Sequence, residues 1–149
     1  AVGDLDIPEG VTLLFENTAG KGTTVGKEFS ALSRMVEETE TDRVGVCLDT
    51  CHMYAAGYDI AEEFDTVMSE VETELGTGNI QLLHINDSKH PLGSEKDEHQ
   101  HIGEGEIGEQ GFRNLLDSEL GKTPKVLETP TNGKGYADNM EKVRKLSSQ

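Results

Sequence analysis

The sequence predicts an α/β fold in which a parallel sheet is covered on its outer side by helices. Three observations favour this class. First, four short apolar runs have the composition of buried strands, and they occupy residues 11–15, 44–48, 80–85 and 125–127. Second, each run is followed by a stretch with the apolar spacing of a helix, an alternation typical of parallel sheets. Third, a carboxylate or histidine stands at the end of every run.

The predicted helices repeat apolar residues every three or four positions, as expected when one helix face is buried. They span residues 28–40, 60–75, 112–120 and 136–146. In the first of them, Phe29, Leu32 and Met35 share one face. The remaining segments are predicted as a loop or helix end at 1–10, a glycine-rich loop at 17–27 and a long polar loop at 86–108.

Four strands are too few to close the standard eight-stranded TIM barrel. We therefore expect the 149 residues to form a single partial TIM-barrel domain, equivalent to half of such a barrel. A dimer of two halves would rebuild an eight-stranded ring, and the sequence neither supports nor excludes it. No stretch approaches the roughly 20 apolar residues of a membrane span, and no leader pattern is visible, so we expect a cytoplasmic protein without membrane contact.

The composition is strongly acidic, with 29 acidic and 13 basic residues and a net charge of −16. At face value this charge argues against nucleic acid, whose phosphates would be repelled. The acidic residues are dispersed along the whole chain, however, as in a protein that works in very high salt, where the Debye length falls to about 3 Å. We interpret the charge as an adaptation to the solvent. The two cysteines, Cys47 and Cys51, are predicted to be reduced thiols.

The strongest functional signal is the chemistry at the ends of the predicted strands, which are Glu16, Asp49, His84 and Glu128 in chain order. The carboxyl ends of parallel strands gather at one edge of the sheet, where α/β proteins form their sites. A buried carboxylate or imidazole is costly unless something compensates it. Because both side chains are ligands of divalent zinc, this set predicts a metal site.

A second candidate ligand set lies close to the first. His52 follows Asp49 within one helical turn of sequence, and Asp97 and His99 are in the long polar loop. In an extended segment, the side chains of residues two positions apart point the same way, so Asp97 and His99 can bind the same ion. His101 is an alternative to His99, and His90 is a weaker candidate.

Residues 103–108 match the dinucleotide-binding pattern G-x-G-x-x-G by letter. The match follows a polar loop where the motif requires a strand. Glu104 and Glu106 would also repel a pyrophosphate. We therefore do not expect a dinucleotide at these glycines.

Four segments resemble the signature segments of endonuclease IV, the zinc-dependent apurinic/apyrimidinic endonuclease family. They read LFENTAGKG, VGVCLDTCHMYAAGYD, LLHINDSKHPLGSEKDEHQHIGEGEIG and VLETP. The resemblance runs from about Val11 to the C-terminus and implies an eight-stranded TIM barrel with three zinc ions, of which this chain is similar to the C-terminal half. It also implies a DNA repair enzyme that cuts double-stranded DNA on the 5′ side of an abasic site, in base excision repair.

The resemblance further implies which residues hold metal. Two complete ligand sets are implied. One consists of Glu16, Asp49, His84 and Glu128, with Glu16 bridging two zinc ions, and the other consists of His52, Asp97 and His99. The remaining zinc takes two histidines from earlier strands that are absent here, so we expect two ions in this chain. Glu16 and Glu128 are also the catalytic candidates. Manganese is an alternative, because it accepts the same ligands. The family usually has Arg where this chain has Glu98.

Two other interpretations stay open. A xylose-isomerase-like sugar isomerase or epimerase would share the ligands at the strand ends, but its one or two metals do not require His52, Asp97 and His99. The chain would otherwise be an inert or merely metal-binding fragment. We expect the isolated 149 residues to be inactive or very weak, with the missing N-terminal half or a dimer partner completing the site.

Overall fold

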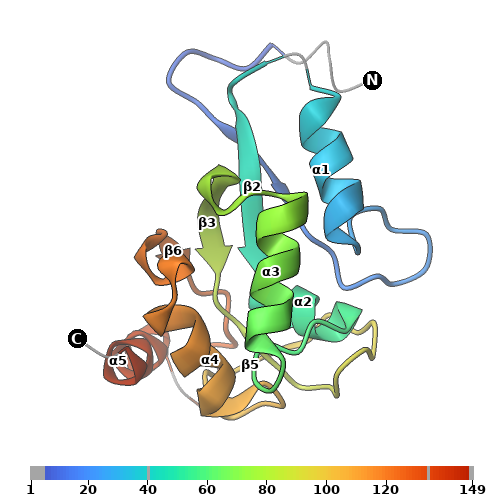
Figure 1. The fold of residues 1–149 in the computed structure, drawn as a ribbon. Helices are drawn as coiled ribbons and strands as arrows, with labels where there is room; N and C mark the ends of the chain where they lie inside the picture. The colour runs from blue at the N-terminus through green and yellow to red at the C-terminus, as the bar shows by residue number, and fades with distance from the viewer. Residues whose placement is uncertain (1–5, 40, 134, 148–149) are drawn as a thin grey trace.

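The computed structural model describes residues 6–39, 41–133 and 135–147. Its centre is a parallel sheet with strand order β1-β2-β3-β6 (Figure 1). The strands are β1 (Leu13–Glu16), β2 (Val44–Asp49), β3 (Ile80–His84) and β6 (Lys125–Val126). They lie side by side in chain order, as expected when each strand is followed by a helix that crosses back over the sheet. The predicted α/β class is therefore confirmed.

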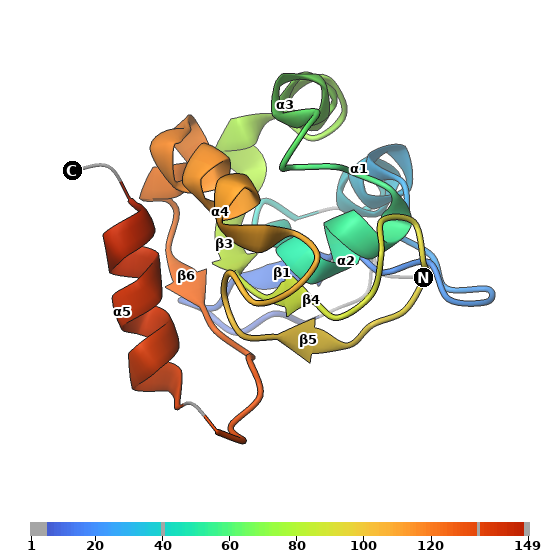
Figure 2. The same ribbon diagram turned by 90° about the horizontal axis from the view of Figure 1, so that it is seen from below.

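The helices form a layer along one side of the sheet, which Figure 2 shows along the strand direction. They are α1 (Phe29–Glu37), α3 (Phe64–Glu74), α4 (Gly108–Asp117) and α5 (Tyr136–Leu146). The core lies between the two layers and includes Phe29, Leu48, Leu83 and Phe112, each at most 1% exposed. None of the helices in the described part of the chain has the length and apolar composition needed to cross a membrane.

Three sequence predictions need correction. A helix that was not predicted, α2 (Thr50–Ala56), follows β2 directly. The next helix, α3, begins four residues later than the predicted start at 60. The predicted helix 112–120 is instead α4, which begins at Gly108, followed by the 3-10 turn η3 (Glu119–Lys122). A second short 3-10 turn, η2 (Thr77–Asn79), precedes β3. The parts of the predictions that fall on residues 1–5 and 40 lie outside the described residues.

The predicted polar loop at 86–108 is partly ordered as a hairpin. Its two strands, β4 (Asp87–Ser88) and β5 (His99–Gln100), pair antiparallel. In Figure 1 β5 lies below the carboxyl ends of the main strands, and Figure 2 shows β4 and β5 side by side next to α2. Because β5 begins at His99, the hairpin brings this part of the loop to the edge where the main strands end.

Asp87 is fully buried, and its carboxylate accepts hydrogen bonds from four backbone N–H groups of the loop. Its Oδ1 accepts hydrogen bonds from the N–H groups of Ser88 (2.8 Å) and Ile107 (3.0 Å). Its Oδ2 accepts from the N–H groups of Gly103 (2.9 Å) and Gly105 (3.0 Å). Burial raises the pKa of the Asp87 carboxyl, and these donors oppose that shift. The glycine pattern at 103–108 therefore wraps backbone around a buried carboxylate, and its resemblance to a dinucleotide motif is coincidental.

Gly105 is required in this loop because of its surroundings. A Cβ on Gly105 would lie 2.3 Å from the Ser88 carbonyl oxygen and 2.5 Å from Asp87 Oδ1. We expect Gly105→Ala to lower the free energy of unfolding by about 2 kcal/mol, as overpacking against rigid neighbours does. Gly78→Ala is the matched control, since nothing lies within 4 Å of a Cβ there, and its effect should stay within about 0.5 kcal/mol. Urea denaturation of both variants checks this, and equal effects would contradict it.

Candidate metal centre

The polar residues at the carboxyl ends of the four main strands lie close together at one edge of the sheet. Glu16, Asp49 and His84 are the last residues of β1, β2 and β3. Glu128 comes just after β6. One ligand atom from each of these residues lies within 4.8 Å of the others. We call Glu16, Asp49, His84 and Glu128 the carboxylate cluster.

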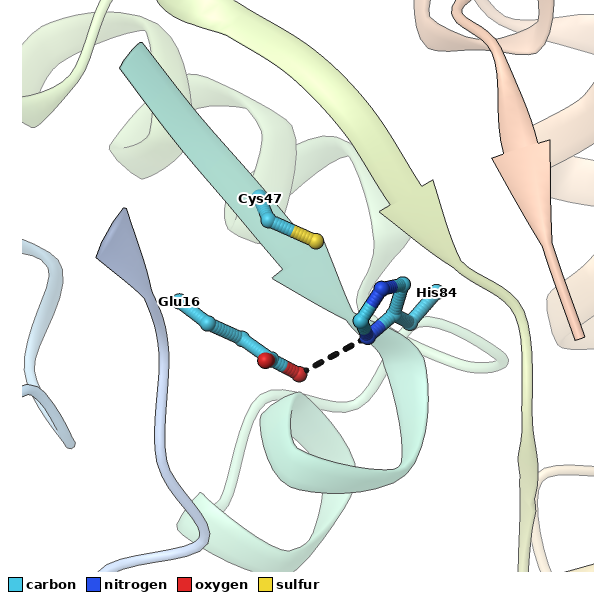
Figure 3. A group of neighbouring side chains, drawn as sticks. All are labelled: Glu16, Cys47 and His84. Carbon is cyan, nitrogen blue, oxygen red and sulfur yellow. Dashed lines mark hydrogen bonds and ion pairs between the residues drawn. The ribbon is translucent and has the colours of Figure 1, made fainter. Parts of the chain in front are cut away.

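His84 stands between the two outer carboxylates of this cluster. Its Nδ1 is 3.0 Å from Glu16 Oε1 and 3.2 Å from Glu128 Oε2. Figure 3 shows Glu16 and His84 reaching toward each other across the end of β2. The Glu16 and Glu128 side chains are 36% and 46% exposed, whereas Asp49 is fully buried. The cluster thus has a buried floor and an open side.

A second group, His52, Asp97 and His99, lies next to the first, and we call it the histidine cluster. Asp97 Oδ1 is 3.1 Å from His52 Nε2 and 3.3 Å from His99 Nε2. His52 comes from α2 and His99 from β5, so the unpredicted helix and hairpin carry the two rings. The seven predicted ligand residues therefore form two adjoining groups, at 3.5 Å between Glu16 Oε1 and His52 Nδ1.

Both rings of the histidine cluster are oriented through their second nitrogen. His52 Nδ1 lies 2.9 Å from the Asn17 carbonyl oxygen, and His99 Nδ1 lies 3.1 Å from the Glu128 carbonyl oxygen. Because a carbonyl oxygen only accepts, Nδ1 is the N–H donor in each ring, and in the neutral imidazole the lone pair of Nε2 faces Asp97. Backbone carbonyls orient metal-binding histidines in the same way.

The chemistry of the side chains around His99 shows whether these residues fit a metal ion. His99 Nε2 is buried and has no hydrogen-bond partner in the described part of the chain. Asp97 Oδ1 lies 3.3 Å and Asp49 Oδ2 lies 3.8 Å from it. A buried polar atom of this kind calls for a partner. Imidazole nitrogens and carboxylate oxygens are the ligands that zinc takes, so the residues fit a zinc ion.

The electrostatics of the site also favour a cation. Burial opposes the protonation of His52, but the charges of Asp49, Asp97 and Glu16 outweigh it and raise the pKa of the imidazole. The three carboxylates of the carboxylate cluster repel one another unless a positive charge joins them, and Asp97 adds a fourth negative charge in the adjoining cluster. The arrangement can therefore bind a divalent ion strongly.

Both cysteines are free, as predicted, and both lie beside the clusters. Burial raises the pKa of Cys47 to about 12 and that of Cys51 to about 12. Figure 3 shows the Cys47 thiol above Glu16 and His84. Cys51 donates a hydrogen bond to the Glu98 carbonyl oxygen at 3.7 Å. As neutral thiols, the cysteines are poorer ligands here than the carboxylates.

The alternative histidines are held elsewhere. His101 Nε2 donates to the Asn132 carbonyl oxygen at 3.1 Å, and its Nδ1 accepts from Asn139 at 3.1 Å, so both nitrogens are used. His90 Nε2 lies 3.2 Å from Glu98 Oε1. Neither is a member of the two clusters. The sequence offered His99 and His101 as partners of Asp97, and the structure places His99 beside it.

Two buried asparagines at this edge were not predicted. Asn17 bonds to the backbone of Asp49, and Asn86 bonds to its carboxylate. Each comes shortly after a predicted ligand, Glu16 or His84. A polar amide directly behind a strand-end ligand is the signal that could have identified them.

A parallel α/β sheet with histidines and carboxylates at the carboxyl ends of its strands defines this chain as part of an α/β barrel protein with a polar site. The sequence model of the xylose isomerase-like TIM barrel family matches residues 1–146, and the chain belongs to this family.

Two similar relatives are named "Probable endonuclease 4". The one from Haloarcula marismortui is 48% identical over 150 residues, covering 98% of this chain and 54% of the relative. The one from Haloquadratum walsbyi is 46% identical over 151 residues, covering 99% of this chain and 54% of the relative. Endonuclease IV from Thermus thermophilus has a solved structure with a TM-score of 0.81 and 41% identity, covering 91% of this chain and 49% of that one. The resemblance to endonuclease IV is confirmed, and the chain spans about half the length of these relatives.

Proposed function

We propose that the protein to which this chain belongs is a zinc-dependent endonuclease. It would hydrolyse the phosphodiester bond on the 5′ side of abasic sites in double-stranded DNA, as part of base excision repair. The observation that carries the proposal is the histidine cluster lying against the carboxylate cluster, with His99 Nε2 buried, close to two carboxylates and without a hydrogen bond among the described residues. The relatives named endonuclease 4 support it.

Each cluster would hold one zinc ion. When bound, zinc lowers the pKa of a coordinated water and stabilises the negative charge that develops on a phosphate under attack. Glu16 and Glu128 are the catalytic candidates, because their carboxylates are half-exposed on the open side of the cluster and can accept a proton there. Asp49 is fully buried, so its role is to bind and orient. Manganese is the alternative ion, since it takes the same ligands.

The competing proposal is a sugar isomerase, which the family description allows. Such an enzyme needs one or two metals at the strand ends, and the carboxylate cluster would suffice. Nothing in that chemistry requires a histidine cluster made by α2 and β5. We therefore favour the nuclease, whose charged phosphodiester substrate benefits from several cations.

The acidic composition suits this proposal only in concentrated salt. At a net charge of −16 the protein repels DNA in dilute buffer. Screening at about 1 M salt shortens the reach of that repulsion to about 3 Å. We propose that the chain is adapted to such a solvent, and that the rest of the barrel or a second copy completes the ring beyond β1 and β6.

The first test is the number of metal ions per chain. After loading with zinc in concentrated salt and exchange into volatile buffer, native mass spectrometry should show two ions. Incision of a duplex with one abasic site should occur only 5′ of that site. It should be far slower than incision by the Haloarcula marismortui relative. The reason is that the resemblance implies two further histidine ligands, which are not among these 149 residues. One ion per chain together with isomerisation of an aldose would favour the sugar isomerase instead.

A further inference from the structure

Buried side chains connect the ends of neighbouring strands behind the two clusters. The Asn17 side chain, after β1, accepts the N–H of Asp49 at 2.7 Å and donates to its carbonyl oxygen at 3.2 Å. The Thr50 hydroxyl, after β2, accepts the N–H of Asn86 at 2.9 Å and donates to its carbonyl oxygen at 2.7 Å. In both pairs one side chain satisfies both backbone groups of a residue at the next strand end.

Asn86 completes the connection across the sheet with its own side chain. Its Oδ1 accepts the N–H of Glu128 at 2.8 Å, and its Nδ2 donates to Asp49 Oδ2 at 2.7 Å. The Glu128 N–H requires an oxygen opposite it, so the orientation of the amide is fixed, and the NH₂ group must face Asp49. Asn86 is fully buried and contacts two members of the carboxylate cluster from behind.

Hydrogen bonds hold both carboxylate oxygens of Asp49. Its Oδ1 accepts the N–H of His52 at 2.8 Å, where it caps the start of α2, and its Oδ2 accepts from Asn86. Without Asn86, Oδ2 would be a buried carboxylate oxygen without its donor, and the χ2 angle of Asp49 would be held on one side only. The backbone of Glu128 would also lose its link to β3.

We propose that Asn86 is the positioning residue of this metal centre. It fixes the separation of Asp49 and Glu128, and thereby sets the affinity of the carboxylate cluster for its ion. This inference rests on the proposed function, because it requires a metal ion in that cluster. Loss of a residue that supports ligands typically costs 10–100-fold in metal affinity, which is the size of effect we expect.

The test is a cobalt(II) titration of the whole chain, followed by absorption in the visible range. Asn86→Ala should weaken the binding of one of the two ions by about 10–100-fold and change its spectrum, while the other ion stays within about threefold. Thr50→Val is the second variant, because it keeps the shape of the side chain but removes both hydrogen bonds to the Asn86 backbone. It should weaken the same ion by a smaller factor, and it carries the test if Asn86→Ala fails to fold.

Asn139→Ala is the matched control. Asn139 is also a buried asparagine, 2% exposed. Its Oδ1 accepts the N–H of Ile102 at 2.9 Å and its Nδ2 donates to His101 Nδ1 at 3.1 Å, and neither partner is a member of either cluster. It should lower the temperature of unfolding without changing either cobalt affinity. Unchanged affinities in Asn86→Ala, or an equal loss in Asn139→Ala, would overturn the role of Asn86 alone. A wild-type chain that binds no cobalt would overturn the proposed function, and this inference with it.

Discussion

Replacement of Asp97 by alanine should remove one of the two metal ions from the chain. Asp97 Oδ1 is the atom on which the two rings of the histidine cluster converge, at 3.1 Å from His52 Nε2 and 3.3 Å from His99 Nε2. It is also the single negative charge of that cluster. Without it, two neutral imidazoles remain, and we expect the affinity for zinc to fall by about 100-fold or more, beyond the 10–100-fold typical of residues that only support ligands. Native mass spectrometry should then show one ion per chain.

The neighbouring residue provides the control. The Glu98 carboxylate is engaged outside the cluster, where it lies 3.2 Å from His90 Nε2 and 3.6 Å from Lys89 Nζ. The Glu98→Ala variant removes the same charge from the same loop, so it should keep both ions. If Asp97→Ala retained two ions, or if both variants lost one, the histidine cluster would not be a metal site.

Much of this site could be predicted from the sequence, because a strand buried on both faces leaves a clear apolar run. The run 44–48 ends at Asp49, and a charged group directly after a buried strand is costly enough to need an explanation. In a parallel sheet all such ends lie at one edge, so Glu16 and Glu128 could be placed together although they are far apart in the chain. The alternation of strands and helices supplied the rest of that argument.

The missed elements lack this kind of pattern. Five of the seven residues of α2 are buried, including Cys51 and Met53, so the helix has no polar face and no helical period. Its sequence signals were Asp49, which caps its start and which we assigned only as a ligand, and Gly57, which ends it in the left-handed conformation. The strands β4 and β5 are two residues long and polar, so they depend on tertiary contacts. The choice between His99 and His101 followed from those contacts.

Asp87→Asn should be among the most destabilising conservative substitutions in the chain. The asparagine would offer one acceptor oxygen and place an NH₂ group against two of the backbone donors, those of Gly103 and Gly105 or those of Ser88 and Ile107. Each buried N–H that loses its acceptor costs about 1–3 kcal/mol. Removing the buried charge offsets part of this cost, since burial raises the pKa of Asp87. We expect a net loss of about 3 kcal/mol in the free energy of unfolding, measured by urea denaturation.

Asp59→Asn is the matched control for this prediction. Asp59 Oδ1 alone accepts the N–H groups of Ala61 at 2.9 Å and Glu62 at 3.0 Å, and asparagine keeps such an oxygen. Its effect should stay within about 0.5 kcal/mol. Equal effects at the two positions would contradict the role given to Asp87. A selective loss at Asp87 should also weaken zinc binding, because Ser88 pairs with His99 in the hairpin that the loop supports. The buried carboxylate would then link the stability of the loop to the position of a metal ligand.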